Sequence, residues 1–228
     1  MKVIRADLSN CHLARGWAVA IDVLRAFTTA AYLFDAGVTE IILASGVEEA
    51  FGLRDAMPDC LILGEVNGIK VPGYDLGNSP TEIMAHDLRG RRLIQRTTAG
   101  TQGVIRVLHA PIILAASLVN AAATARYLAR CAPEEVTLIQ TGMLSGEGWG
   151  DEDVACADLI ECRLAGKEMA LAQIEQRVRR SRSGLYYDGT RPDFPSSDLD
   201  YALRFDHFDF AMRVERQETL AILRAVPA

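Results

Sequence analysis

The chain has few of the residues that mark disulfide-rich, zinc-scaffold or membrane proteins. Its 228 residues include five cysteines, and no two of them form a CxxC pair. An odd cysteine count without paired spacing argues against a disulfide framework and a structural zinc site. No apolar run approaches the ~20 residues of a membrane-spanning helix, and Met1–Asp7 lacks the apolar core of a signal peptide. We therefore expect a cytoplasmic protein with no membrane partner.

Basic residues are fewer than acidic residues, 24 against 30, and the formal net charge is -6. An acidic chain without a basic run argues against nucleic acid as a partner. A small anionic substrate stays compatible, because a local site can be positive on an acidic protein.

Several familiar catalytic patterns are absent. There is no GxSxG and no GxxxxGK[ST], and the four histidines lack HExxH spacing. Cys156 and Cys162 lie in a predicted helix without the Cys-x5-Arg spacing of cysteine phosphatases. These absences argue against a nucleophile-elbow hydrolase, a P-loop enzyme, a zinc hydrolase and a cysteine phosphatase.

Apolar runs alternate with helical patterns along the chain, which predicts a three-layer α/β/α fold with a largely parallel or mixed central sheet. The expected strands are 17–21, 40–44, 60–63, 92–95, 111–115 and 135–140, and the expected helices are 25–36, 47–57, 80–88, 102–108, 120–130 and 153–182. We expect one α/β domain over residues 1–228, with a division into two lobes left open. The tail, from about Phe194, reads as irregular chain with a short helix or strand.

Two loops carry the strongest functional signal. Lys70–Pro80 combines two glycines, two prolines, Asn78 and Ser79, so its shape is fixed and its backbone can approach a ligand closely. Thr97–Thr101 is either an anion-binding nest or the N-capped start of a helix. Because the two loops occur together, we favour an anion site that uses Asn78, Ser79, Thr97, Thr98, Gly100 and Thr101.

Polar residues follow the predicted strands, where ligands of open α/β sheets bind. Asp22 follows the first strand and Glu65 the third, and Asp153 ends the glycine-rich stretch 142–153. Carboxylates suit Mg²⁺, which needs only one or two of them beside substrate and water oxygens. Asp22 and the acidic residues at 151–153 can also act as ordinary helix-start residues.

Arg25 and Asn120 complete the predicted anion site. Arg25 is expected in the first turn of a helix, where a cation opposes the helix dipole, so we predict that it faces an anion. Asn120 follows the fifth predicted strand and is a candidate donor to the same ligand.

These segments resemble the 2-phosphosulfolactate phosphatase family, Mg²⁺-dependent enzymes of coenzyme M biosynthesis. The resemblance runs in order through Ile21–Thr29, Gly64–Glu65, Gly73–Pro80, Thr97–Thr101, Ser117–Ala123 and Glu152–Ala157. Two positions depart from it, since Val66 and Ala99 stand where the family usually has arginine and asparagine. We predict that these departures weaken activity on phosphosulfolactate.

The resemblance implies a Mg²⁺-dependent phosphatase acting on a small anionic phosphoester, 2-phosphosulfolactate or a related phosphorylated acid. The metal or acid/base candidates are Asp22, Glu65 and Asp153, and the substrate-binding candidates are Arg25, Asn78, Ser79, Thr97, Thr98, Gly100, Thr101 and Asn120. Two alternatives stay open: another phosphoryl-transfer enzyme on the same scaffold, and a non-catalytic protein that binds an anionic metabolite. A homodimer is also left open.

Overall fold

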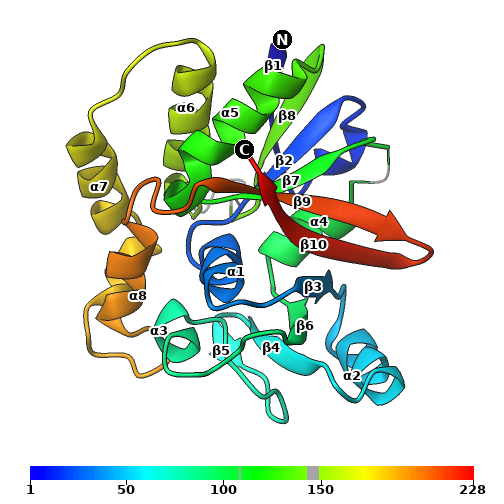
Figure 1. Cartoon of the computed structure of the whole chain (residues 1–228). Coiled ribbons are helices and arrows are strands. Elements are labelled where there is room, and N and C mark those ends of the chain that lie inside the picture. The colour runs from blue at the N-terminus through cyan, green and yellow to red at the C-terminus, as the bar shows by residue number, and fades with distance from the viewer. Residues whose placement is uncertain (108, 143–148) are drawn as a thin grey trace.

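The computed structural model describes residues 1–107, 109–142 and 149–228, and its described strands form one ten-stranded mixed sheet (Figure 1). The order across the sheet is β1-β8-β2-β7-β9-β10-β3-β6-β4-β5. The strands are β1 (Lys2–Asp7), β2 (Trp17–Ile21), β3 (Glu40–Leu43), β4 (Leu61–Val66), β5 (Ile69–Lys70), β6 (Arg92–Arg96), β7 (Ile113–Ala116), β8 (Glu135–Gln140), β9 (Phe210–Gln217) and β10 (Leu220–Pro227).

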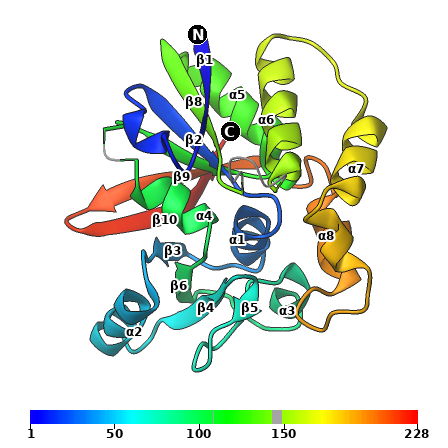
Figure 2. The same ribbon diagram turned by 180° about the vertical axis from the view of Figure 1, so that it is seen from behind.

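Helices cover both faces of this sheet, which confirms the predicted three-layer α/β/α fold (Figures 1 and 2). The helices are α1 (Ala26–Asp35), α2 (Val47–Ala56), α3 (Pro80–Ile83), α4 (Gly100–Ile105), α5 (Ala121–Cys131), α6 (Asp151–Leu164), α7 (Leu171–Arg180) and α8 (Ser196–Ala202), with 3-10 turns η1 (Cys11–Leu13), η2 (Leu118–Asn120) and η3 (Gly184–Tyr187). None of the helices in the described ranges is long and apolar enough to cross a membrane.

Alternation along β2 shows how the sheet divides the core. Ala18 and Ala20 face a cluster that contains α1 and α4, whereas Val19 and Ile21 face a second cluster formed with α5 and α6. Successive side chains of a strand point to opposite faces, so a run that is apolar throughout marks a strand buried on both sides. A third cluster joins α2 to β3, β4 and β6.

The hairpin β9–β10 divides the sheet into two parallel groups of strands. We call β1, β8, β2 and β7 the first half-sheet, and β3, β6 and β4 the second half-sheet. Each half is internally parallel, but three antiparallel pairings separate them: β7 with β9, β9 with β10, and β10 with β3. The two halves therefore run in opposite directions along the sheet.

Sheet twist brings the carboxyl ends of the two halves back together. Neighbouring strands rotate by roughly 20–25°, and six steps of the strand order lead from β2 to β4. The accumulated rotation is roughly 120–150°. A rotation of this size offsets most of the 180° difference in direction between the two half-sheets. Residues after β2 and β8 can thus face residues after β4 and β6 across one pocket.

The sequence-based prediction was wrong for residues 153–182, which form two helices instead of one. α6 ends at Leu164 and α7 begins at Leu171. Gly166 between them has φ +66°, a left-handed conformation that commonly ends helices at glycine.

The tail was also predicted wrongly, because it holds α8 and the two central strands of the sheet. β9 and β10 pair over their full length around a short turn in which Glu218 has φ 52°. That turn lacks the Asn-Gly or Asp-Gly sequence of common hairpins. Arginines along both strands further obscured the apolar alternation.

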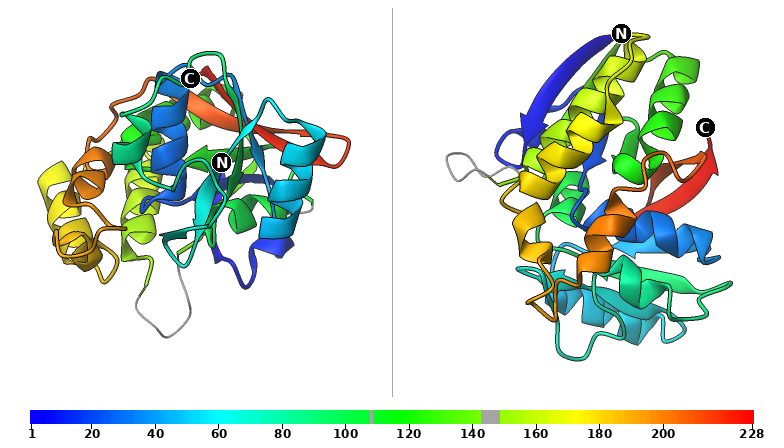
Figure 3. Two further views of the ribbon diagram at one scale, coloured as in Figure 1. Left: turned by 90° about the horizontal axis from the view of Figure 1, so that it is seen from below. Right: turned by 90° about the vertical axis from the view of Figure 1, so that its left-hand side faces the viewer.

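The segment from α7 to α8 lies along one side of the molecule (Figure 3, yellow to orange). α8 packs against α3 and η3, and α7 packs against α6 and η3. This segment also supplies residues to the lining of the pocket.

Candidate active site

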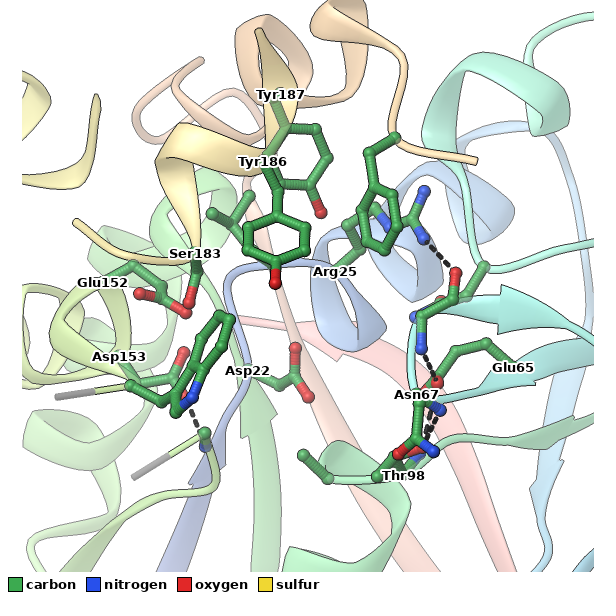
Figure 4. A pocket seen from close by; sticks show the side chains of 17 residues that line it. Asp22, Arg25, Glu65, Asn67, Thr98, Glu152, Asp153, Ser183, Tyr186 and Tyr187 are labelled. Atoms are coloured by element: carbon green, nitrogen blue, oxygen red, sulfur yellow. Dashed lines mark hydrogen bonds between the residues drawn. The ribbon is translucent and has the colours of Figure 1, made fainter. Parts of the chain in front are cut away.

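A pocket of about 430 Å³ lies where the carboxyl ends of β2, β4, β6 and β8 converge (Figure 4). The volume falls within the ~300–1,000 Å³ that is usual for small-molecule sites. Its lining residues are Asp22, Leu24, Arg25, Glu65, Asn67, Gly68, Asn78, Thr98, Ala99, Gly142, Trp149, Glu152, Asp153, Ser183, Tyr186, Tyr187 and Phe194. The three predicted carboxylates thus meet in one place. Residues 143–148 of the predicted glycine-rich loop lie outside the described residues.

Asp22 and Asp153 are held by backbone N–H groups at the carboxyl ends of β2 and β8. Oδ1 of Asp22 accepts a hydrogen bond from the N–H of Ala26 at 2.8 Å, so this carboxylate does stabilise the start of α1. Asp153 accepts from the N–H groups of Val23 and Gly142, both at 2.8 Å. Asp22 still lines the pocket, and Figure 4 shows its carboxylate facing the centre.

Buried negative charge accumulates on this side of the pocket. Burial raises the pKa of Asp22 to about 7, and the charges of Glu65 and Glu152 add to the shift. Burial raises the pKa of Asp153 well above its usual range, with further contributions from Asp22 and Glu152. Burial likewise raises the pKa of Glu152, although the hydroxyls of Ser181 and Ser183 act to lower it. Oε2 of Glu152 has no hydrogen-bond partner among the described residues. Within the described ranges, none of these three carboxylates forms an ion pair with a basic side chain, so their negative charges are not compensated there.

Glu65 joins two loops of the second half-sheet. Its carboxylate accepts from the N–H of Thr98 at 2.6 Å, from the hydroxyl of Thr98 at 2.9 Å and from the N–H of Gly68 at 2.6 Å. The N–H of Asn67 in turn donates to the Thr98 hydroxyl at 2.8 Å. Glu65 thereby fixes both the β4–β5 turn and the loop after β6.

Arg25 lines the pocket, yet its guanidinium is already paired. Nη1 lies 2.8 Å from Oδ2 of Asp198, and the two side chains are 4% and 0% exposed. Nη1 also donates to the carbonyl of Asp193 at 2.9 Å, and Nη2 donates to the carbonyl of Gly68 at 3.0 Å. Arg25 immediately precedes α1, and Asp198 neutralises this cation at the start of the helix. Its contact with a substrate anion stays a prediction.

Asp198 also anchors the loop that the sequence singled out. Its Oδ1 accepts from the hydroxyl of Ser79 at 2.8 Å and from the N–H of Thr81 at 2.9 Å. Ser79 itself caps α3 by accepting from the N–H of Glu82. The neighbouring Asn78 lines the pocket, and its Oδ1 has no partner among the described residues. Sequence reasoning missed Asp198, because nothing in residues 196–202 marks a site.

Five of the predicted substrate-binding residues lie outside the pocket lining: Ser79, Thr97, Gly100, Thr101 and Asn120. Thr97 and Thr101 bond to each other, with the N–H of Thr101 donating to Oγ1 of Thr97 at 3.0 Å. The Thr97 hydroxyl thus serves an N–H of the first turn of α4, as in the alternative that the sequence left open, while Ala99 at the N-cap position provides no side-chain cap. Asn120 is buried and accepts from the N–H of Ser117 at 3.0 Å. The binding roles of all five residues stay predictions.

Gly100 has a steric role at the site. A Cβ atom at this position would lie 2.5 Å from Cβ of Ala26 and 2.8 Å from Oδ2 of Asp22. Glycine thus lets the start of α4 approach Asp22 closely. Of the two positions that depart from the family pattern, Ala99 lines the pocket, whereas Val66 does not.

Four aromatic residues of the pocket were not predicted from the sequence: Trp149, Tyr186, Tyr187 and Phe194. Three of them come from the segment between α7 and α8. The pair Tyr186-Tyr187 beside Leu185 was the available signal, but an apolar cluster in a presumed helix or tail more often belongs to a core.

Mg²⁺ fits the chemistry of these residues, although no three His, Cys, Asp or Glu residues within the described ranges form a ready cluster for a metal. The unpartnered Oε2 of Glu152 and the raised carboxylate pKa values show a site with surplus negative charge. Mg²⁺ takes carboxylate oxygens and fills most of its shell with water and phosphate oxygens. Glu152 was not among the predicted residues, and it joins Asp22 and Asp153 as a candidate ligand.

The fold and the pocket define an α/β protein with an acidic ligand site at the carboxyl ends of its strands. Its sequence narrows this class further, since residues 3–187 match the family described as 2-phosphosulpholactate phosphatase. The chain belongs to this family, which confirms the predicted resemblance and the enzyme class, a phosphoric monoester hydrolase.

Similar proteins from several bacteria bear the name "Probable 2-phosphosulfolactate phosphatase". The protein of Carboxydothermus hydrogenoformans is 44% identical over 212 residues, which are 92% of this chain and 84% of that protein. The protein of Bacillus subtilis is 31% identical over 210 residues, which are 91% of each chain. The protein of Deinococcus radiodurans is 42% identical over 144 residues, which are 63% of this chain and 59% of that protein.

Proposed function

We propose that this protein is a Mg²⁺-dependent phosphatase that hydrolyses a small phosphorylated acid, 2-phosphosulfolactate or a relative of it. The observation that carries the proposal is a pocket with four buried carboxylates, Asp22, Glu65, Glu152 and Asp153. The names of similar proteins support the phosphatase class. The cytoplasm as its location and a homodimer as its assembly stay predictions from the sequence.

Asp153 and Glu152 are the residues that we propose hold the metal, with Asp22 beside them. The two backbone N–H groups on Asp153 fix the direction of its carboxylate. Bound Mg²⁺ would supply positive charge to the phosphoryl oxygens as negative charge shifts in the transition state.

Asp22 is the residue that we propose takes a proton from the attacking water. A pKa near 7 suits a general base at neutral pH, and Oδ2 of Asp22 accepts from the hydroxyl of Thr141 at 3.3 Å. On the opposite side, Arg25 has five N–H donors, and Asp193, Asp198 and Gly68 take three of them. At most two donors are left for the substrate phosphate.

Metal removal tests the proposal. EDTA treatment should abolish release of phosphate from 2-phosphosulfolactate and 2-phospholactate, and added Mg²⁺ should restore it. Circular dichroism before and after chelation should show that the protein stays folded. Full activity in the metal-free protein would contradict the proposed metal role. Thermal stabilisation by the esters without any phosphate release, even with Mg²⁺, would favour a binding protein instead.

A further inference from the structure

Asp198 has a fully buried carboxylate that does not itself line the pocket. It lies in the first turn of α8, and each of its oxygens contacts a different part of the site. Oδ2 lies 2.8 Å from Nη1 of Arg25, whereas Oδ1 accepts from the hydroxyl of Ser79 at 2.8 Å and from the N–H of Thr81 at 2.9 Å. Asp198 therefore joins two segments that meet only in the folded chain.

The first of these contacts balances the charge of Arg25. Nη1 of Arg25 also donates to the carbonyl of Asp193, and Nη2 donates to the carbonyl of Gly68. The ring centroid of Phe194 lies 5.0 Å from Cζ of Arg25. Among these contacting groups, the carboxylate of Asp198 is the one with a formal negative charge. A buried cation that loses such a partner is strongly unfavourable.

The second contact fixes the chain directly after Asn78. Asn78 lines the pocket and is 5% exposed, and its Oδ1 has no hydrogen-bond partner within the described ranges. The next residue, Ser79, is held through its hydroxyl by Asp198, and the hydroxyls of Thr81 and Ser197 lie 2.7 Å apart. A buried amide oxygen without a partner costs free energy, so the neighbouring contacts must hold Asn78 at the pocket.

We infer that Asp198 is a positioning residue that holds Arg25 and Asn78 in register for binding the anionic substrate. The inference rests on the proposed function, in which the remaining donors of Arg25 meet the substrate phosphate. Figure 4 shows Arg25 across the pocket from Glu152 and Asp153. An unpaired guanidinium would be attracted toward those carboxylates, and Asp198 keeps it in place on its own side. Donors that are fixed in this way bind an anion without first rearranging.

Asp198→Asn tests the inference, because it removes the charge but keeps the size and one acceptor oxygen. With saturating Mg²⁺, KM for 2-phosphosulfolactate should rise by about tenfold or more, whereas kcat per folded molecule should change by less than about threefold. A smaller folded fraction lowers the maximal rate but does not change KM, so KM distinguishes positioning from a structural role. An unchanged KM in folded Asp198→Asn protein would overturn the inference.

The melting temperature should change independently of KM. Asp198→Asn leaves Arg25 buried without its charged partner, so the melting temperature should fall by about 6 °C or more. Combining it with Arg25→Met removes both charges and should recover most of this loss. KM of the double variant should equal that of Arg25→Met alone, because Asp198 acts through Arg25. If the single variant does not fold, a normal KM in the folded double variant would still overturn the inference.

Asp206→Asn is the matched control. Asp206 is another carboxylate of the tail that pairs with an arginine, and its Oδ1 lies 2.6 Å from Nη1 of Arg163. It also accepts from the N–H of Ala122 at 2.8 Å, and it does not line the pocket. Its loss should lower the melting temperature and leave KM unchanged. An equal rise of KM in Asp206→Asn and Asp198→Asn would show a general loosening of the tail and overturn the inference.

Binding without turnover distinguishes failure of this inference from failure of the proposed function. Isothermal titration calorimetry with Mg²⁺ measures the affinities for 2-phosphosulfolactate and for inorganic phosphate. Weaker binding to Asp198→Asn than to the unchanged protein, with no phosphate release by either, would support the positioning role and reject the phosphatase. Equal binding to the two folded proteins would overturn the positioning role, whether or not the ester is hydrolysed.

Discussion

The two half-sheets contribute carboxylates to the same pocket, but they hold them differently. Asp22 and Asp153, after the first half-sheet, accept backbone N–H bonds and carry raised pKa values from burial and mutual repulsion. Glu65, in the second half-sheet, accepts three short hydrogen bonds that tie two loops together. The negative charges of Asp22 and Asp153 thus stay uncompensated, whereas the charge of Glu65 accepts hydrogen bonds that hold two loops in place.

This difference separates two roles that residue type alone cannot separate. A buried carboxylate without a cation costs folding free energy, so its retention points to a function. A carboxylate with three donors stabilises the fold around it. The sequence placed Asp22, Glu65 and Asp153 in one group, and the structure suggests dividing that group by half-sheet.

The largest expected effect on activity follows from neutralising Asp22, which comes directly after β2 of the first half-sheet. Asp22→Asn keeps the acceptor for the N–H of Ala26 but removes the negative charge and the proposed base. Phosphatase activity should fall by at least about 100-fold, while the free energy of unfolding at pH 8 should stay equal or rise. Steady-state kinetics and urea unfolding measure both quantities.

The exposed residue at the other end of the same helix provides the control for this change. Asp35→Asn should leave activity and stability near those of the unchanged protein. A marked loss of stability in Asp22→Asn, with turnover per folded molecule retained, would show that Asp22 is structural.

A second variant tests the second half-sheet. Glu65→Gln turns one acceptor oxygen into an amide donor that faces the N–H of Gly68 and the hydroxyl of Thr98. The free energy of unfolding should fall by about 1–3 kcal/mol, as measured in urea, whereas Glu48→Gln on the exposed side of α2 should change it little. Equal losses of stability in Glu65→Gln and Asp22→Asn would remove the contrast between the half-sheets.

The smallest expected effect is a pH dependence of the metal-free protein. The pKa of Asp22 is raised in the folded state to about 7, against about 4 in the unfolded chain. The folded state therefore binds the proton more tightly, and stability rises as the pH falls from about 7 toward 4. The melting temperature at pH 6 should exceed that at pH 8 by a few degrees, at about 2–4 °C for each kcal/mol.

Two comparisons sharpen this measurement. Asp22→Asn should flatten the pH dependence, and Mg²⁺ should stabilise the protein more at pH 8 than at pH 6. A melting temperature that rises between pH 6 and pH 8 in the metal-free protein would contradict the assignment of surplus charge to this side of the pocket.

The sequence predicted the features that depend on neighbouring residues along the chain, namely the strands and the polar residues at their ends. Each strand of a parallel sheet is an apolar run that ends at a polar residue, so Asp22 and Glu65 stood out at once. The tight approach of Gly100 to Asp22 could not be predicted, because it depends on how α4 docks beside α1. The sequence shows a glycine in this loop, but only the packing of α4 against Asp22 and Ala26 explains why a larger residue does not fit there.

The tail escaped prediction for a different reason. Asp198 has its partners more than a hundred positions earlier in the chain, at Arg25 and Ser79. Phe194, at the start of the tail, likewise packs against Tyr186 and Tyr187 at the pocket. Such long-range pairings carry no local pattern, so charge and periodicity within a short window cannot reveal them.

The central position of β9–β10 also sets an order of events during synthesis. β7 pairs with β9 and β3 pairs with β10, so the hairpin is the joint between the half-sheets. These strands are the last described elements to leave the ribosome. Until residues 210–227 emerge, the nascent chain carries two incomplete sheets with exposed edges, which can pair with other chains. A ribosome pause shortly before Phe210 would therefore leave this protein at its greatest risk of aggregation.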